Sequence, residues 1–351
     1  MKHAAPHSCN VLHLDADTRR LWQFDTDGGQ VKLSTEASGV VGKPLPAPLV
    51  AKGWQSLWQR KLNIAWLPAD QVFLRVVQLP KCEFAELLSM VEFQLEKLSP
   101  LPVAQIVWSL EIFPSHSTVP SELQTVVVVI IARNLVESFL GQLESQGYLA
   151  DRLELPFLHQ LLATRIEGDG AWIYPRVIGD KTDCLVAWWY GGVLQNLSLA
   201  HLTVRETWGK DLGEQLTKIA WAGELEGWLT APPRWHLVAD DATAAIWQPL
   251  LNAHAEQSVE VTSTLELPAW AAASARRVAR AETTVNLLPA EFGARYQQQL
   301  VDRIWMRGLG GVAVVYIMGV LIYFAMLQVL QFQKHGIEQK VADLSGSYTN
   351  A

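Results

Sequence analysis

The sequence has few cysteines, no excess of positive charge and no apolar run near its start. Its three cysteines, Cys9, Cys82 and Cys184, lie far apart and form no CxxC pair, which argues against a zinc site or a disulfide framework. The net charge of −7 gives no basic cluster for a phosphate backbone, so nucleic-acid binding is not expected. Residues 1–10 lack the apolar stretch of a signal peptide, and we expect the region that follows to stay in the cytosol.

The common catalytic and metal-binding motifs are also missing. The sequence contains no GxSxG, HExxH, Walker A or GxGxxG motif in a suitable context. His3, His7 and Cys9 gather near the N-terminus, but no further spaced ligands accompany them, which favours a flexible end over a metal site. We therefore expect no catalytic residue and no metal.

One long apolar run is present near the C-terminus. Residues Leu309 to Leu330 carry no charge, and as a helix they would extend about 33 Å, against about 30 Å for the hydrocarbon core of a bilayer. Trp305 lies beside Arg303 and Arg307, where an interfacial anchor is expected. The run predicts a single transmembrane helix.

Basic residues are unequally divided between the two sides of this run. The N-terminal side carries Arg276, Arg277, Arg280, Arg295, Arg303 and Arg307, and the C-terminal side carries Lys334 and Lys340. The positive-inside rule then places the N-terminal domain in the cytoplasm.

A heptad-like stripe follows the apolar run. Its members, spaced alternately by three and four residues, are Leu327, Leu330, Lys334, Ile337, Val341 and Leu344. The spacing predicts that the helix continues as a coiled coil that pairs two chains, either identical or different. A solvated stalk is the alternative.

The N-terminal region alternates between strand and helix patterns. Two short strands, Val11 to Leu14 and Leu21 to Phe24, are predicted around a polar turn at 15–20. A strand at Gln71 to Leu79 precedes a helix that ends at Leu98, and a buried strand at Thr125 to Ala132 precedes a second helix. These alternations indicate a mixed α/β fold.

The pattern then restarts. A hairpin is predicted from Asp183 to Trp189 and Val193 to Leu199 around Gly191 and Gly192, with further helices and strands up to residue 262. Residues 269–281 are compatible with a helix or a linker. The two halves open alike, with a hairpin followed by helices.

Two stretches resemble a known family. Ala65 to Pro102 and Ala132 to Pro156 resemble the PilM-type actin-like proteins of type IV pilus machines and the cytoplasmic domain of the type II secretion protein GspL. Asn286, Leu287, Leu288 and Pro289 resemble the NLLP motif that opens PilN, the bitopic partner that docks on PilM. The whole resembles a PilM–PilN fusion, as in GspL.

The resemblance implies an organisation and a docking site. We expect actin-like subdomain I at 1–165, subdomain II at 166–270, a linker with the NLLP motif at 271–308, the transmembrane helix at 309–330 and the start of a periplasmic coiled coil at 331–351. The motif Asn286 to Pro289 would dock in a groove of an actin-like domain, its own or a neighbour's.

The resemblance also locates the positions where actin-like ATPases hold a nucleotide between two hairpins. Asp15 and Asp17 in the first hairpin and Asp183 in the second are acids without the family's accompanying glycine. The adenosine-side glycine pair is replaced by Val238 to Ala242. We therefore expect degenerate nucleotide positions and no cofactor, with ATP binding as the alternative.

These inferences predict a non-catalytic platform protein of the inner membrane in a type II secretion or type IV pilus-like system. It would couple a cytosolic assembly ATPase and other platform subunits to periplasmic partners. An active actin-like ATPase is the first alternative. A single-pass signalling receptor is disfavoured, because no sensor domain follows the span and no kinase or DNA-binding motif precedes it.

Overall fold

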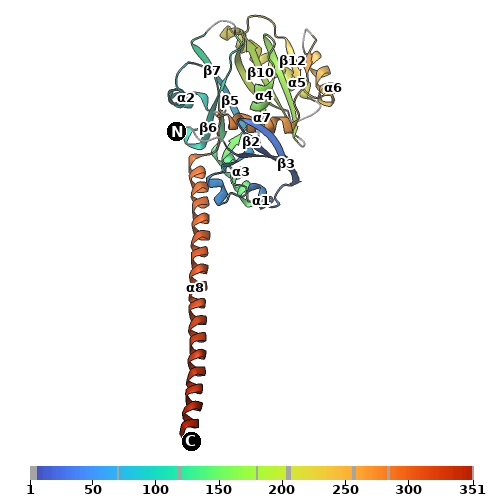
Figure 1. Ribbon diagram of the computed structural model, residues 1–351. Helices are drawn as coiled ribbons and strands as arrows, with labels where there is room; N and C mark the ends of the chain where they lie inside the picture. Colours follow the sequence, from blue (N-terminus) through green and yellow to red (C-terminus); the bar gives the residue numbers. More distant parts are fainter. Residues whose placement is uncertain are drawn as a thin grey trace. The chain divides into compact units, whose positions relative to one another are not determined.

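The computed structural model describes residues 6–68, 71–117, 121–178, 181–202, 207–254, 258–282 and 285–349. The chain divides into two compact units, Met1–Gly293 and Ala294–Ala351. The first unit contains almost all of the strands and helices, and the second is part of one long helix (Figure 1).

The first sheet is a meander extended by two parallel strands. Its strands are β1 (Ser8–Leu14), β2 (Thr18–Asp27), β3 (Gln30–Val40), β4 (Lys61–Trp66) and β8 (Arg152–Glu154), in the spatial order β3-β2-β1-β4-β8. The first three strands pair antiparallel, whereas β1, β4 and β8 run parallel. The strand β8 therefore forms one edge of this sheet.

The second sheet repeats this arrangement. Its strands are β9 (Gly170–Ile178), β10 (Lys181–Tyr190), β11 (Val193–Leu202), β12 (Trp235–Val238) and β13 (Glu260–Thr262), in the order β11-β10-β9-β12-β13. The antiparallel and parallel pairs fall in the same places as in the first sheet. This duplication is the actin-like arrangement that the resemblance implies, and the predicted α/β fold class is confirmed.

A third, smaller sheet is inserted between β4 and β8. It consists of β5 (Val72–Pro80), β6 (Ile106–Phe113) and β7 (Leu123–Ala132), in the order β5-β7-β6. Helix α2 (Phe84–Leu98) covers it, because Leu87, Val91 and Leu95 recur on one face and pack against the apolar strands. At its far end His116 donates its amide to the carbonyl of Gly192 over 2.7 Å, which joins this sheet to the second lobe.

The remaining helices cover the two large sheets. They are α1 (Ala47–Val50), α3 (Arg133–Ser145), α4 (Pro156–Ala163), α5 (Trp208–Glu226), α6 (Asp241–Asn252), α7 (Leu267–Ala279) and α8 (Ala290–Thr349), with short 3-10 turns η1 (Trp54–Leu57) and η2 (Val103–Gln105). Helices α4 and α7 run through the middle of the first unit (Figure 1). We call the first sheet with its insertion and α7 the first lobe, and the second sheet with α5 and α6 the second lobe.

Two boundaries differ from the sequence predictions. Residues 271–308 are not a linker, because α7 buries Trp270, Ala271 and Ala275 against the first sheet and α8 begins at Ala290. The second lobe opens with three strands and not two, since β9 precedes the predicted hairpin. Pro175 and the polar residues beside it interrupt the apolar alternation of β9, which hid this strand.

Candidate functional site

The segment Val285–Pro289, here called the strap, is bound to the outer edge of β8. Leu287 donates its amide to the carbonyl of Leu153 over 2.9 Å, and the amide of Leu153 donates to Oδ1 of Asn286 over 3.1 Å. The same Oδ1 accepts the amide of Leu288 over 3.1 Å. The strap thus supplies partners for an edge strand, much as an added β-strand would.

The strap is anchored by apolar side chains as well. Val285 and Leu287 are 2% and 0% exposed, Pro289 is buried, and Leu288 is half-buried. The leucine pair of the predicted docking motif therefore divides into one fully buried member and one that reaches the surface. Full burial of a leucine stabilises a structure by about 1.5–3 kcal/mol, so Leu287 is the main apolar anchor.

A buried carboxylate lies beneath the strap. Oε1 of Glu154 is 2.9 Å from Nε of Arg152, and Oε2 is 2.9 Å from Nε2 of His159. Ser274 on α7 donates its hydroxyl to the same Oε2 over 2.7 Å. Burial disfavours ionisation of Glu154, but the hydrogen bond and charge of His159, the charge of Arg152 and the Ser274 hydroxyl outweigh it and lower its pKa to about 2.

A second buried ion pair connects the strap to β6 and α7. Glu111 on β6 is 2% exposed and pairs with Arg277 on α7 over 2.5 Å. Oε2 of Glu111 accepts the amide of Val285 over 3.3 Å, while Arg152 donates to the carbonyl of Val285 over 2.5 Å. Charged side chains therefore bind both the amide and the carbonyl of Val285. Hydrogen bonds to charged groups are stronger than those between neutral groups.

Sequence reasoning did not find this charged network. Glu111 interrupts the apolar strand IVWSLEIF, and Glu154 stands between Leu153 and Leu155. A carboxylate within a buried apolar strand must be paired, and that signal was present in the sequence. Arg152 and His159 lie within five residues of Glu154, but Ser274 and Arg277 lie more than a hundred residues beyond the acids that they bind and were not identifiable.

Two of the predicted nucleotide-site acids lie at the tip of the first hairpin. Asp15 and Asp17 follow β1 and are exposed. Oδ1 of Asp15 accepts the amide of Ala16 over 2.8 Å, and the Asp15 amide donates to the carbonyl of Thr18 over 2.8 Å. In this turn Ala16 and Asp17 follow Asp15, so the position where the resemblance expects a glycine carries the side chain of Asp17 in the space that a glycine would leave open to an approaching phosphate.

The third acid, Asp183, is not in a turn, which corrects the sequence prediction. It lies inside β10 opposite Arg176 on β9 and His201 on β11, and Nδ1 of His201 is 2.7 Å from its Oδ1. Residues 179–180, which connect β9 to β10 in the sequence, lie outside the described residues. Because β9 was missed, the predicted second hairpin was displaced by one strand.

The β1–β2 pair of the first lobe and the β9–β10 pair of the second lobe carry polar residues at equivalent positions. His13 pairs with Arg20 in the first lobe, as Arg176 pairs with Asp183 in the second, and seven residues separate the members of each pair. Burial and the nearby charge of Arg176 lower the pKa of His13 to about 4, with Asp15 opposing. Burial also lowers the pKa of Arg176, which Asp183 and Asp15 raise. The charge of Arg176 therefore acts on His13 and Asp15 of the first lobe as well as on Asp183 of its own lobe.

The expected adenosine-side segment has a structural role. Asp240 precedes α6 and its Oδ1 accepts the amide of Thr243 over 2.7 Å, which caps the helix. This hydrogen bond lowers the pKa of Asp240. Asp240 and Asp241 therefore start a helix, and no glycine pair replaces them.

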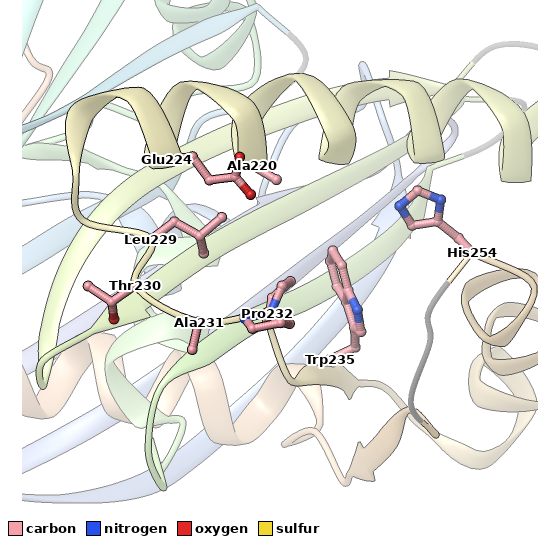
Figure 2. Close-up of a pocket in the computed structure, with 9 residues that line it drawn as sticks. Ala220, Glu224, Leu229, Thr230, Ala231, Pro232, Trp235 and His254 are labelled. Carbon is pink, nitrogen blue, oxygen red and sulfur yellow. The ribbon is translucent and has the colours of Figure 1, made fainter.

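A cavity lies elsewhere in the second lobe. Its volume is about 410 Å³, and its walls come from α5, the 229–233 segment, Trp235 and His254 (Figure 2). Trp235 and His254 meet edge to face with ring centroids 5.8 Å apart. None of the predicted site residues lines this cavity. Among the described residues, no group of three or more His, Cys, Asp or Glu is arranged to hold a metal.

The long helix α8 carries the apolar run. Within the described residues it is the one helix long and apolar enough to cross a membrane, with a mean hydropathy of 2.3 over its most apolar part. Of the predicted coiled-coil residues, Leu330, Ile337 and Val341 are at least 60% exposed. Lys334 reaches Glu338 over 3.6 Å on the same helix. The side chain of Leu344 lies outside the described residues.

Comparisons with known proteins give structural likeness and no sequence family. No family model matches, and no curated protein matches. A PilM–PilN type IV pilus biogenesis complex is similar, at 17% identity and a TM-score of 0.46, over 77% of this chain and 96% of that chain. The cytoplasmic domain of EpsL, an inner membrane component of the type II secretion system of Vibrio cholerae, is similar at 15% identity and a TM-score of 0.40, over 81% and 99%. A Bacteroides thetaiotaomicron protein with an actin-like ATPase fold has 10% identity and a TM-score of 0.37, over 74% and 91%. The fold assignment therefore rests on the duplicated strand order.

Proposed function

We propose that this chain is a non-catalytic platform protein of the inner membrane in a type II secretion or type IV pilus-like system. The observation that carries the proposal is the strap, a PilN-like motif bound to the actin-like unit immediately before a helix suited to crossing a membrane. Force or displacement at the domain would pass through the strap into α8. The chain's work is then mechanical coupling between a cytosolic assembly ATPase and partners on the far side of the membrane.

The buried ion pairs support a coupling role. The strap is bound at Val285 by Glu111 of β6 and Arg152 of β8, and Glu111 is itself paired with Arg277 of α7, so departure of the strap removes a hydrogen-bond partner from each of two charged groups. A hydrogen bond to a charged group contributes about 1.5–3 kcal/mol. A connection of this strength lets the domain and the helix move as one.

The proposal assigns the chain a single-pass topology with the actin-like unit in the cytoplasm. The coiled-coil seam after the span would pair with a second copy or with a related platform subunit. Asn286, Leu287, Leu288 and Pro289 are then the residues that fix the domain to its anchor, and the groove that receives them belongs to the same chain.

An active actin-like ATPase is the competing function, and the hairpins disfavour it. The first turn has Asp17 where a glycine would admit a phosphate, and Arg176 adds positive charge near the acids that would have to bind a metal. Titration of ATP–Mg²⁺ into the full chain in detergent separates the two functions. No heat and no thermal shift at millimolar nucleotide supports the platform, and micromolar binding would overturn it.

A test in cells complements the titration. Deletion of the gene should abolish secretion or piliation, and the Asp15→Asn, Asp17→Asn double variant should restore it as well as the wild type does. Asp27→Asn, an exposed turn acid of the same lobe, is the matched control. If Asp27→Asn restores secretion or piliation and the double variant does not, the result would favour the ATPase function.

A further inference from the structure

The cavity of the second lobe takes no part in the proposed function. Its volume of about 410 Å³ lies within the range of small-ligand clefts, roughly 300–1,000 Å³, and exceeds what one buried water fills. The C-terminal half of α5 forms one wall and the 229–233 segment forms another, while Trp235 and His254 stand at one end (Figure 2). The cavity therefore joins three separate segments of this lobe around one space.

Two glycines of α5 border this space. A Cβ at Gly213 would lie 3.0 Å from Nδ1 of His254, and a Cβ at Gly223 would lie 2.5 Å from Cζ2 of Trp228. The helix thus has no side chain at the two points where these rings pack on it, although glycine inside a helix is unfavourable. Between the two contacts along α5, Ala220 lines the cavity with only a methyl group. The space beside Ala220 is therefore bordered by close contacts.

The walls offer hydrogen-bond acceptors more than donors. Pro232 and Pro233 have no N–H, so this part of the wall presents carbonyl oxygens alone. The amide of Leu229 is already donated to the carbonyl of Gly223 over 3.1 Å. Across the cavity Glu224 contributes a carboxylate, which forms no hydrogen bond or ion pair with any residue that the structure describes. A ligand that donates hydrogen bonds suits these walls.

The charge around the cavity is negative. Glu224 and Glu226 both lie in the last turn of α5, at the end of the helix dipole that disfavours anions, and this turn carries no basic residue. From residue 219 to residue 233 the sequence contains no Lys or Arg. A cation bound beside Glu224 would relieve the repulsion between the two acids and the helix end.

The nearest cations along the chain face other directions. Lys218 precedes Ala220 by two residues, which turns its side chain about 200° around α5, away from the cavity. Arg234 precedes Trp235, but its charge acts on the other side of β12. There it adds to the effect of burial in lowering the pKa of His236, a residue that alternates with Trp235 along the strand. Neither Lys218 nor Arg234 lines the cavity.

We propose that this cavity binds a guanidinium or alkylammonium group, with Glu224 as its counter-ion and the Trp235 indole as an aromatic wall. A carboxylate forms charge-assisted hydrogen bonds with such cations, and tryptophan is the aromatic side chain that attracts them most strongly. Two sources carry this chemistry, a free aliphatic amine and an arginine or lysine side chain of a partner protein. The site goes beyond the proposed platform role and does not depend on it.

Calorimetric titration of the full chain in a non-ionic detergent tests the proposal with three probes. Agmatine is a free organic cation, Nα-acetyl-arginine N-methylamide imitates a protein side chain, and the corresponding citrulline compound has the same shape without the charge. Saturable binding is expected for the two cations and none for the citrulline compound. Tighter binding of the blocked arginine would identify a protein side chain as the source, and tighter binding of agmatine would identify a free amine. Equal binding of the arginine and citrulline compounds would overturn the proposal, as would no binding of either cation.

Matched variants locate the binding. Glu224→Gln should weaken the affinity for both cations about fivefold, the upper end for an exposed charge pair, whereas Glu214→Gln, an exposed acid of α5 outside the cavity, should leave it unchanged. Ala220→Leu fills the space beside α5 and should abolish binding, with Ala222→Leu on the exposed side of the helix as its control. Wild-type affinity in both Glu224→Gln and Ala220→Leu would overturn the proposal. None of these variants alters the strap or α8, so the platform role is tested separately.

Discussion

Leu287 and Leu153 are joined by a backbone hydrogen bond of 2.9 Å, which ties the residues before α8 to the edge of the first sheet. The contact places the PilN-like motif and its groove in one chain. Because Leu287 is also fully buried, the connection combines a directional bond with apolar burial.

Replacing Leu287 by alanine should loosen the strap. The change leaves a cavity where a fully buried side chain stood, at a cost of about 2–5 kcal/mol. Tryptic cleavage after Arg280 should accelerate in the variant. Leu288→Ala is the control, since its half-buried side chain should cost less. Equal cleavage rates in Leu287→Ala and wild type would count against the strap as an anchor.

Asn286 should contribute through its side-chain oxygen. Asn286→Ala leaves the amide of Leu153 without its acceptor, a loss of about 1–3 kcal/mol, whereas Asn286→Asp keeps an oxygen at that position. Hydrogen exchange at Leu153 measures the effect directly. Faster exchange is expected in the alanine variant and near-wild-type exchange in the aspartate variant. The reverse order would contradict the role of Oδ1.

Glu154 should stabilise the fold in a defined acidic window. Its pKa is lowered from 4.5 to about 2 in the folded state, so the folded protein binds fewer protons than the unfolded one between these values. The stabilisation, about 3 kcal/mol, is present above pH 4.5 and is lost as pH falls toward 2. Denaturant titrations of wild type and Glu154→Gln should differ most at neutral pH and converge as the pH approaches 2. A constant difference would contradict this assignment.

His13 should act in a separate window. Burial and Arg176 lower its pKa from 6.5 to about 4, so the folded state holds a neutral imidazole. Stability is unaffected above pH 6.5 and declines by about 3 kcal/mol as pH falls to 4, because only the unfolded chain accepts the proton readily. In His13→Gln this slope should disappear while the Glu154 window remains. A slope unchanged in the variant would place the titrating group elsewhere.

The apolar run should be sensitive to charge at its centre. Arginine at Val315 and Leu321 costs about 2.5–3.5 kcal/mol per residue on insertion scales. The double variant should be released from membranes by alkaline carbonate, whereas the wild type should stay. Phe332→Arg, beyond the predicted span, is the control. Retention of the double variant would argue that α8 is not embedded.

Periodicity revealed those elements whose side chains follow one pattern without interruption. Helix α2 ends at Leu98 as predicted, and β7 extends the predicted Thr125–Ala132 strand by two residues at its start. Strands β9 and β6 escaped because Pro175 and Glu111 break their apolar alternation. Glu111 is satisfied by Arg277, which is 166 residues away and beyond the reach of local reasoning.

The sequence alone determined the apolar helix, the alternation of strands and helices, and the presence of the NLLP motif, because each depends on neighbouring residues. Only the tertiary structure decided that the strap binds its own domain, that Glu111 and Glu154 are paired beneath it, and that Asp183 lies within a strand facing Arg176. Those outcomes depend on which distant segments share a low-dielectric interior, where a charge is stable only beside its partner. For Glu111 that partner is Arg277, 166 residues away, so only packing settles it.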